Sequence, residues 1–449
     1  NILESELTWN PNQINASDIK WQTIIVDNSQ VNLLLEPSFF SLNKQRWDIE
    51  KASDMSVTSN DLHISKLVLK RGRQFISLDG CISRNDADKM NFRVHEVDLN
   101  ELGTLVGSPI KMNGLLNGWG NISNPYTNLH YMGDASIFGL FLNDQEVGDI
   151  FVQSQWNKGS ESIGMTGDLM YRGNQTFAFQ GSYFTERKDE NLEFDLLFDN
   201  TDIQFTSAFL DPDIVNNIRG QLNGSLSVSG TPDFPKLDGR VKLNGGNAKI
   251  EILGVNFGFD GEVIADEYGF YINNMPVSDE EGNTGSLIGS VYHEQYEDWN
   301  FDIQIELEGN TFYDADAVSF GGNGNSSRFL VMNTKYKDGE YYYGKAYASG
   351  YANIFGYTDN LEITVDMRSL KGTSIYFPMY GAADIDEDDG LITFISKDSL
   401  QLQQDKKIDF TGVSLDLNFK VTPDANMKII FNDQTGDEIA ARGSGDINI

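Results

Sequence analysis

The chain has 449 residues, and its 67 acidic and 33 basic side chains give a formal net charge of -34. This length exceeds the size at which a single hydrophobic core stops growing, which predicts several domains or an extended stack. The charge excludes proteins that bind nucleic acid or an anionic bilayer through a general basic surface.

Strand patterns begin near the N-terminus, and the chain then repeats itself. Residues 114–118 have the pattern Gly-x-Leu-Asn-Gly, which returns 106 positions later at residues 220–224. Asn-Gly is a turn signal, and a repeated unit of strands and turns favours a stack over one central pocket. We therefore expect four segments: a β-rich stack over 1–90, two repeats over 91–200 and 201–284, and a C-terminal β domain over 285–449.

Helix is predicted in only two short stretches. Residues 98–105 place leucines on one helical stripe behind Asp98, a suitable N-cap. Residues 212–218 follow Asp211, which could cap a second helix in the same way. Each stretch precedes one copy of the repeat.

Strict alternation of apolar and polar residues recurs along the rest of the chain and predicts strands with one apolar face. If the sheet folds into a U, these faces line its interior. The residues expected to form that lining are Leu226, Val228, Val241, Leu243, Ile250, Ile252, Phe301, Ile303, Ile305, Leu307, Leu361, Ile363, Val365, Val413, Leu415, Leu417 and Phe419.

Two interpretations of this pattern stay open. The apolar faces could enclose a groove for hydrocarbon, or two apposed sheets could close on each other as a dry sandwich core. The predicted fold class is all-β: an elongated, U-shaped stacked sheet with an apolar interior and few short helices.

Residues typical of catalysis or metal binding are sparse. The four histidines, His63, His95, His130 and His293, have no metal-ligand spacing and no neighbouring nucleophile. Cys81 is the only cysteine, which excludes an internal disulfide framework. The acidic run 384–390 resembles a calcium loop but has Asp389 where that loop needs glycine and Ile395 where it needs glutamate. We expect no catalytic residue, metal or cofactor, although a chance pair of carboxylates could meet in space.

Several motifs resemble the AsmA-like family, and in particular its TamB members. One is the second repeat copy with its continuation through Pro232 and Gly239. Others lie at residues 278–283, 343–346, 372–378 and 423–437. The resemblance is closest over 200–449 and weakest before residue 90.

This resemblance implies a non-enzymatic periplasmic bridge between the inner and outer membranes. Its fold would be a long β-taco whose apolar groove shields phospholipid acyl chains or nascent outer-membrane proteins. Its C-terminal partner would be a TamA-like barrel of the Omp85 family, and nucleic acid is not an expected partner. No apolar run in the sequence is long enough to cross a bilayer. We expect the chain to be part of a longer protein with an N-terminal inner-membrane helix.

Two other functions are compatible with the sequence. A scaffold could pair a strand near residues 443–449 with an outer-membrane barrel by β-augmentation and carry no lipid. A polysaccharide-active β-helix or an adhesin would show a tight repeat of roughly 20 to 30 residues, which a spacing of 106 residues disfavours.

Overall fold

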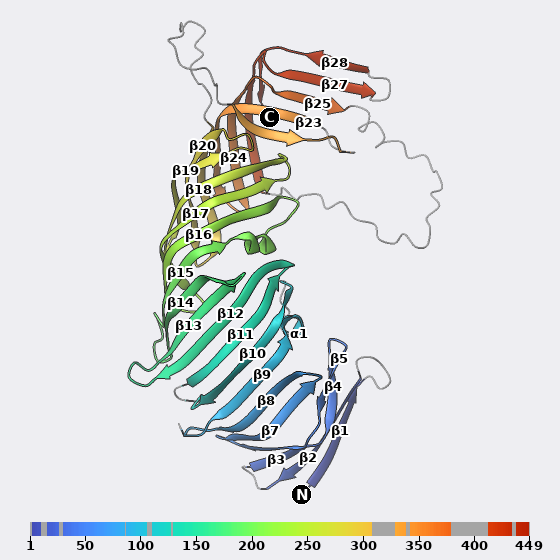
Figure 1. The fold of residues 1–449 in the computed structure, drawn as a ribbon, viewed down its shortest axis with the longest axis vertical. Helices are drawn as coiled ribbons and strands as arrows, with labels where there is room; N and C mark the ends of the chain where they lie inside the picture. Colours follow the sequence, from blue (N-terminus) through green and yellow to red (C-terminus); the bar gives the residue numbers. More distant parts are fainter. Residues whose placement is uncertain are drawn as a thin grey trace, which may run out of the picture. The chain divides into compact units, whose positions relative to one another are not determined.

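The computed structural model is built almost entirely of β-strands (Figure 1). It describes residues 2–9, 16–26, 30–85, 87–105, 110–126, 129–307, 328–337, 342–378, 412–432 and 437–448. Within these residues, 29 strands are assigned to one sheet, accompanied by one α-helix and one 3-10 helix. The expected all-β class with few short helices is confirmed. The calcium-like run 384–390 lies outside the described residues.

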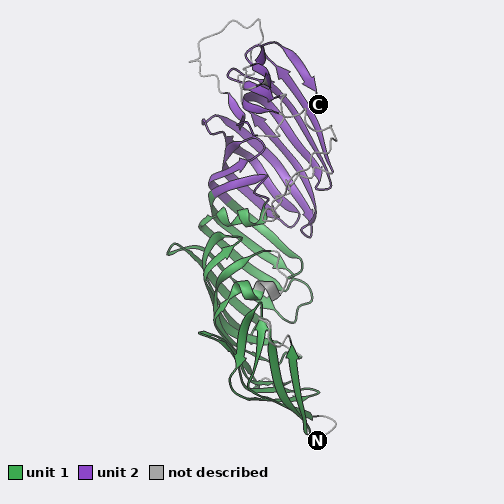
Figure 2. Cartoon of the chain, turned by 90° about the vertical axis from the view of Figure 1, so that its right-hand side faces the viewer, with its two compact units in different colours: residues 1–210, 220–241 green, residues 211–219, 242–449 purple. Residues whose placement is uncertain are grey.

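Contacts group the chain into two compact units (Figure 2). Unit 1 comprises residues 1–210 and 220–241, and unit 2 comprises residues 211–219 and 242–449. The expected division into four segments stays a prediction.

The first strands of unit 1 are β1 (Ile2–Trp9), β2 (Ser17–Ile25), β3 (Gln30–Leu35), β4 (Ser38–Leu42), β5 (Gln45–Ile49), β6 (Ser53–Thr58), β7 (Leu62–Arg71), β8 (Gln74–Ile82) and β9 (Met90–Asp98). Helix α1 (Leu99–Leu105) follows, and then β10 (Met112–Ser123), β11 (His130–Leu142), β12 (Gln145–Asn157), β13 (Ser162–Tyr171), β14 (Asn174–Phe184), β15 (Leu192–Asp202) and η1 (Gln204–Phe209). Strands β16 (Val215–Gly230) and β17 (Pro235–Ile250) contribute residues to both units.

Unit 2 continues with β18 (Val255–Asp266), β19 (Gly269–Ser278), β20 (Thr284–Glu294), β21 (Glu297–Leu307), β22 (Phe329–Thr334), β23 (Tyr343–Tyr357) and β24 (Asn360–Ser369). It ends with β25 (Ser374–Pro378), β26 (Val413–Val421), β27 (Asn426–Asn432), β28 (Asp437–Ala441) and β29 (Gly445–Asn448). Most neighbouring strands are antiparallel, but β26 runs parallel to β24, and β27 runs parallel to β25.

The first predicted helix is confirmed, and Asp98 caps it. Helix α1 starts at Leu99, and the Asn100 N–H donates a hydrogen bond of 2.9 Å to Asp98 Oδ1. This bond satisfies one of the backbone donors that a helix leaves unpaired at its N-terminus.

The second predicted helix is wrong. Residues 212–214 form a single turn, closed by hydrogen bonds of 3.0 Å from the Ile214 and Val215 N–H groups to the Asp211 carbonyl. Val215 then begins β16, because its β-branched side chain and the two asparagines after it favour helix poorly and the following alternation suits a long strand. The helical turn lies earlier, in η1, where Asp202 Oδ1 accepts the Gln204 N–H at 2.8 Å.

The repeated asparagine supports a β-bulge on the preceding strand. Asn117 Oδ1 accepts the Glu96 N–H, and Asn223 Oδ1 accepts the Asn200 N–H, both at 2.9 Å. Glu96 and Asn200 have positive φ angles, and the register shifts beside each of them. At three other positive-φ positions the acceptor is an aspartate on the following strand. The Lys66 N–H donates to Asp79, the Gly139 N–H to Asp149 and the Gly245 N–H to Asp260. Such bulges bend strands and increase their twist.

Replacing Asn117 with alanine is expected to leave the Glu96 N–H without its acceptor and to destabilise unit 1 by about 1 kcal/mol. Asn117→Asp keeps the acceptor, as at the other bulges, and should cost less. The shift in the thermal transition of unit 1 measures the loss of stability in each variant. Equal losses for the two variants would mean that the hydrogen bond does not support the bulge.

Six strands near the N-terminus close into a ring. Strand β2 pairs with β3, β3 with β6 and β6 with β7. Strand β5 then joins β7 to β4, and β4 returns to β2. The ring interior holds a buried cluster formed by Ile49, Ile64, Leu67 and Met90. Beyond the ring, β7–β15 form an antiparallel meander.

Candidate functional site

One face of the sheet in unit 1 is apolar along consecutive strands, and we call it the apolar face. The pairing register from β7 to β16 aligns two rows of side chains on it. The first row is Leu67, Leu78, Phe92, Gly120, Gly133, Ser154, Met165, Gly181, Phe194 and Val228. The second row is Leu69, Ile76, Val94, Gly118, Ala135, Val152, Gly167, Phe179, Leu196 and Leu226. Ser154 is the single side chain of these rows that is polar.

The opposite face, which we call the polar face, carries the intervening residues. The row between the two above reads Ser77, Arg93, Trp119, Asp134, Gln153, Thr166, Gln180, Asp195 and Ser227. The alternation expected from the sequence therefore separates the two faces, as the pleat of a strand requires.

The apolar face of β10–β16 is shielded but not sealed. Phe194, Leu196, Leu226 and Val228 are half-buried, whereas their neighbours on the polar face are exposed. None of the three clusters of buried hydrophobic residues includes a residue of β10–β16. Ile163 and Leu169 on the same face of β13 are 5 % and 9 % exposed. Side chains in a dry sandwich core would be fully buried, so β15 and β16, but not β13, resemble the wall of a groove more than a closed core.

Glycines on the apolar face lie beneath aromatic rings of the neighbouring strand. The Phe179 ring occupies the place that a Cβ on Gly167 would need, and the Phe194 ring does the same at Gly181. Both glycines pair directly with the strand that carries the ring. The rings therefore lie close to the backbone, so the surface of the apolar face is comparatively flat there.

In unit 2 the register brings the predicted residues of β21, β24 and β26 onto one face. Strand β23 lies between β21 and β24, and the rows continue through it. One row is Met275, Leu287, Ile305, Ala352, Val365 and Leu417, and the next is Ile272, Gly289, Ile303, Ile354, Ile363 and Leu415. Two flanking rows contain Phe301, Leu361 and Val413, and Leu307, Met367 and Phe419.

Part of this second face is covered. Phe329 on β22 is 1 % exposed and forms a buried cluster with Val277 and Leu307, against which Ile305 packs. Phe301 and Ile303, farther along the same strand, are half-buried. The predicted lining residues of β21 thus pass from core packing at Leu307 to partial exposure at Phe301.

The remaining predicted residues lie around β16 and β17. Leu226 and Val228 end the two rows of unit 1, and Val241 is buried. Leu243 and Ile250 are half-buried in unit 2. Ile252 lies in the turn after β17, outside the strands, and its side chain is 51 % exposed.

A buried carboxylate organises the turn between β19 and β20. Asp279 is 6 % exposed, and its Oδ1 accepts the N–H groups of Glu281 and Asn283 at 2.9 and 2.8 Å. Its Oδ2 accepts the Asn283 side-chain amide at 2.8 Å and the Leu330 N–H at 2.6 Å. The last bond ties β22 to the turn.

Glu281, also in this turn, links it to β23. Glu281 accepts hydrogen bonds from Lys345 Nζ at 2.6 Å and from the Tyr347 hydroxyl at 2.7 Å. The backbone of Tyr347 in turn exchanges hydrogen bonds with the Thr373 hydroxyl, at 3.0 and 3.1 Å. The Asn426 N–H donates to the Thr373 carbonyl at 2.9 Å.

Four motifs that are distant in the sequence therefore meet at one place. They are residues 278–283, 343–346, 372–378 and 423–437, represented by Asp279, Lys345, Thr373 and Asn426. The chain over residues 273–449 matches the family model described as the TamB C-terminal domain. These residues are therefore similar to the TamB C-terminal domain, and we refer to them below as the TamB domain.

The TamB family belongs to the cell envelope, and its proteins serve transport and assembly there. No curated protein and no solved structure matches the chain. None of the helices in the described residues is long and apolar enough to span a bilayer. The matched residues begin within β19, so they include the whole turn around Asp279.

Two of the histidines have packing roles. His130 stacks on Trp156 and His293 on Tyr296, with ring centroids 4.1 and 4.3 Å apart. Burial raises the pKa of the Cys81 thiol, and the nearby carboxylates of Asp88 and Asp61 raise it further, so the reactive thiolate is disfavoured. Within the described residues, no three potential ligands are grouped closely enough to hold a metal ion.

The Glu281 ion pair should give the TamB domain an acid-dependent stability. Hydrogen bonds, first from Lys345 and then from Tyr347, hold the pKa of Glu281 below its ordinary value of 4.5. A lowered folded-state pKa stabilises the fold above the unfolded pKa, and that stabilisation is lost as the pH falls through the folded value. We expect under about 1 kcal/mol, because the pair is partly exposed. Thermal transitions of the wild type and Glu281→Gln should differ at pH 6, and the difference should shrink as the pH falls below 4.5. A constant difference would contradict this origin.

Proposed function

We propose that this chain acts without catalysis as part of a TamB bridge in the periplasm, and that its apolar faces carry phospholipid acyl chains between the inner and outer membranes. The observation that supports this proposal is the pair of apolar rows in unit 1, which run through β10–β16 and reach the half-buried side chains of Phe194, Leu196, Leu226 and Val228. Apolar surface that is shielded by hydrocarbon gains about 25 cal/mol per Å².

The low relief of the face supports a moving cargo. A flexible acyl chain binds such a surface by area and shape, without fixed polar contacts, so many neighbouring positions have similar energies. Rings that lie over Gly167 and Gly181 remove the ridges that would hold a chain at one position. Nascent strands of outer-membrane proteins, which also expose apolar side chains, are a second class of cargo for the same face.

Photo-crosslinking can test the proposal with matched neighbours. A photo-reactive residue at Leu196 on the apolar face should capture co-purifying phospholipid, identified by mass spectrometry. The same residue at Leu197, which is 56 % exposed on the polar face, should capture none. In unit 2, Ile303 and Ile288 provide the same comparison, because Ile288 is 50 % exposed on the polar face. Equal capture at both positions of each pair would refute the groove.

A second function, assembly with an Omp85-type barrel such as a TamA-like protein, is supported by the strands at the C-terminal end. Strand β29 pairs with β26, and β28 pairs with β27; the described residues of β28 and β29 are all exposed. Exposed strand edges can add a partner strand by β-augmentation.

Proline substitutions separate this function from lipid carriage. Asp446→Pro and Ile447→Pro remove N–H groups that point to opposite edges of β29, since successive N–H groups in a strand alternate. The variant that removes an N–H from the free edge should abolish binding to the barrel and leave lipid capture at Leu196 unchanged. Retained binding in both variants would exclude this edge.

A further inference from the structure

The closed ring of unit 1 contains the beginning of the apolar face. Leu67 and Leu69 on β7 are the first members of the two rows, and both pack in the ring interior against the cluster that includes Ile49. Ile49 and its neighbour Trp47 on β5 are 5 % and 3 % exposed. The hairpin β4–β5 therefore closes over apolar side chains that continue into the uncovered rows.

The two seams that close the ring differ in strength. At β2–β4 the register pair Asp18 and Phe39 is reinforced by hydrogen bonds of Ser41 to Ser17 and to the Ala16 carbonyl, at 3.0 and 2.7 Å. At β5–β7 the single register pair is Asp48 and Lys70. The ion pair beside it, Lys70 with Glu50 at 3.2 Å, is exposed, and exposed pairs contribute little.

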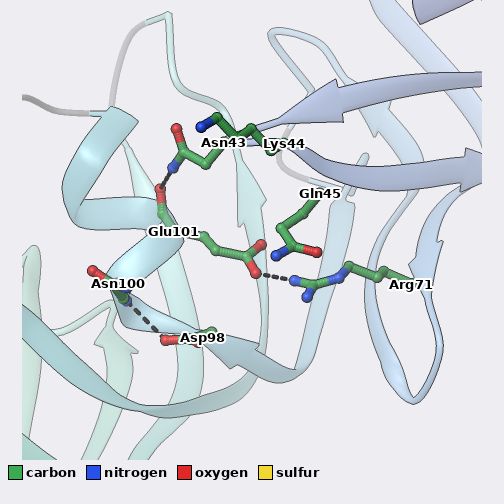
Figure 3. Close-up of a pocket in the computed structure, with 7 residues that line it drawn as sticks. All are labelled: Asn43, Lys44, Gln45, Arg71, Asp98, Asn100 and Glu101. Atoms are coloured by element: carbon green, nitrogen blue, oxygen red, sulfur yellow. Dashed lines mark hydrogen bonds and ion pairs between the residues drawn. The ribbon is translucent and has the colours of Figure 1, made fainter. Parts of the chain in front are cut away.

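A polar cavity of about 400 Å³ lies where the weaker seam meets α1 (Figure 3). The hairpin tip contributes Asn43, Lys44 and Gln45, β7 contributes Arg71, and Asp98, Asn100 and Glu101 line the side of α1. The Asn43 side-chain amide donates to the Glu101 carbonyl at 3.3 Å, which holds the tip against the helix.

The Glu101 carboxylate in this cavity is only half satisfied. Its side chain pairs with Arg71 through one oxygen, as Figure 3 shows, while Oε2 is buried and has no hydrogen-bond partner among the described residues. The residue is 7 % exposed. In the closed ring only water in the cavity can satisfy this oxygen, and opening of the seam would give it full access to solvent.

We propose that the seam between β5 and β7 is a lateral gate of unit 1. The hairpin β4–β5 swings away from β7 about the stronger β2–β4 seam, which exposes Leu67 and Leu69 and lengthens the uncovered apolar face. Burial of Trp47 and Ile49 favours the closed gate, whereas hydration of Glu101 favours the open one. Passage of hydrocarbon through the gate depends on the proposed function, whereas opening of the gate does not.

The gate can be locked across its own seam. Asp48 and Lys70 are direct cross-strand partners in antiparallel strands, a geometry in which a cysteine pair can form a disulfide. We would introduce Asp48→Cys and Lys70→Cys with Cys81→Ser. Arg71→Met is the opening variant, because it leaves the Glu101 charge buried without its partner. Asn43→Ala is a milder one that removes only the tip contact.

Hydrogen exchange followed by mass spectrometry measures opening of the seam directly. Arg71→Met should raise exchange in β5 and in the β5-facing part of β7 at least tenfold, with β13 and β14 unchanged. The oxidised cysteine pair should suppress exchange at the seam below that of the reduced pair. If Arg71→Met raises exchange throughout unit 1, the milder variant Asn43→Ala tests whether the seam alone can open. The gate is refuted if neither variant raises exchange at the seam selectively.

Lipid capture separates this inference from the function on which it rests. With the gate locked, a photo-reactive residue at Leu69 should lose phospholipid capture while Leu196 retains it. Capture at Leu69 that persists in the oxidised protein would refute passage through the seam. Absence of capture at Leu196 in every form would refute the lipid function and leave the exchange result standing.

Discussion

Asp279→Ala is expected to destabilise the TamB domain strongly, by on the order of 3–5 kcal/mol. The carboxylate accepts four hydrogen bonds, three of them from the backbone N–H groups of Glu281, Asn283 and Leu330. Alanine leaves these donors without their acceptor in a site that is largely shielded from water. Because Leu330 belongs to a buried cluster with Val255 and Tyr347, the loss should spread into the core of unit 2.

The thermal transition of unit 2, read together with hydrogen exchange of β22, measures this effect. Asp279→Asn keeps one carbonyl acceptor and should fall between alanine and the wild type. Asp302→Ala is the matched control, because Asp302 is an exposed aspartate on the polar face of β21, where a change of at most about 0.5 kcal/mol is expected. If Asp279→Ala and Asp302→Ala behave alike, the turn does not organise the domain.

Alternation predicted the faces of the sheet well because it is a local property. Each strand of unit 2 with a strict period of two, such as the one from Phe301 to Leu307, has its apolar residues on the expected face. The pattern fails where a bulge inserts a residue. Val94 and Val97 are three positions apart, yet both lie on the apolar face, because Glu96 lies in a bulge between them. The expectation that the repeated Asn-Gly marks a turn is wrong, because both copies lie within strands, β10 and β16, where their asparagines support bulges on the preceding strands.

Contacts between distant segments could not be predicted in the same way. The run around Asp279 forms a turn, but nothing local in the sequence shows that its carboxylate binds the Leu330 backbone 51 positions later. The expectation of a helix over 212–218 failed for a related reason. Asp211 does hold a turn, but the hydrogen bonds available along β16 outweigh a short helix. Whether the apolar face was open or sealed depended on burial, which alternation does not determine.

Leu196→Asp is expected to abolish phospholipid binding by unit 1, with at least a tenfold loss of co-purified lipid. Leu196 lies in the second row, between Phe179 and Leu226, and is half-buried. A carboxylate there must lose its hydration when hydrocarbon covers it, which costs several kcal/mol, and each 1.4 kcal/mol is a factor of ten in binding.

Leu197→Asp is the control for this prediction, since it introduces the same charge one residue away on the polar face, where the side chain stays in water. Its lipid content should match that of the wild type. Thermal transitions show whether either variant loses the fold, and Leu196→Gln, which adds no charge, provides a second test if Leu196→Asp does. Lipid content that falls equally in the Leu196→Asp and Leu197→Asp variants would indicate a general effect of charge. Lipid content that falls in neither would exclude the apolar face of unit 1 as the binding surface.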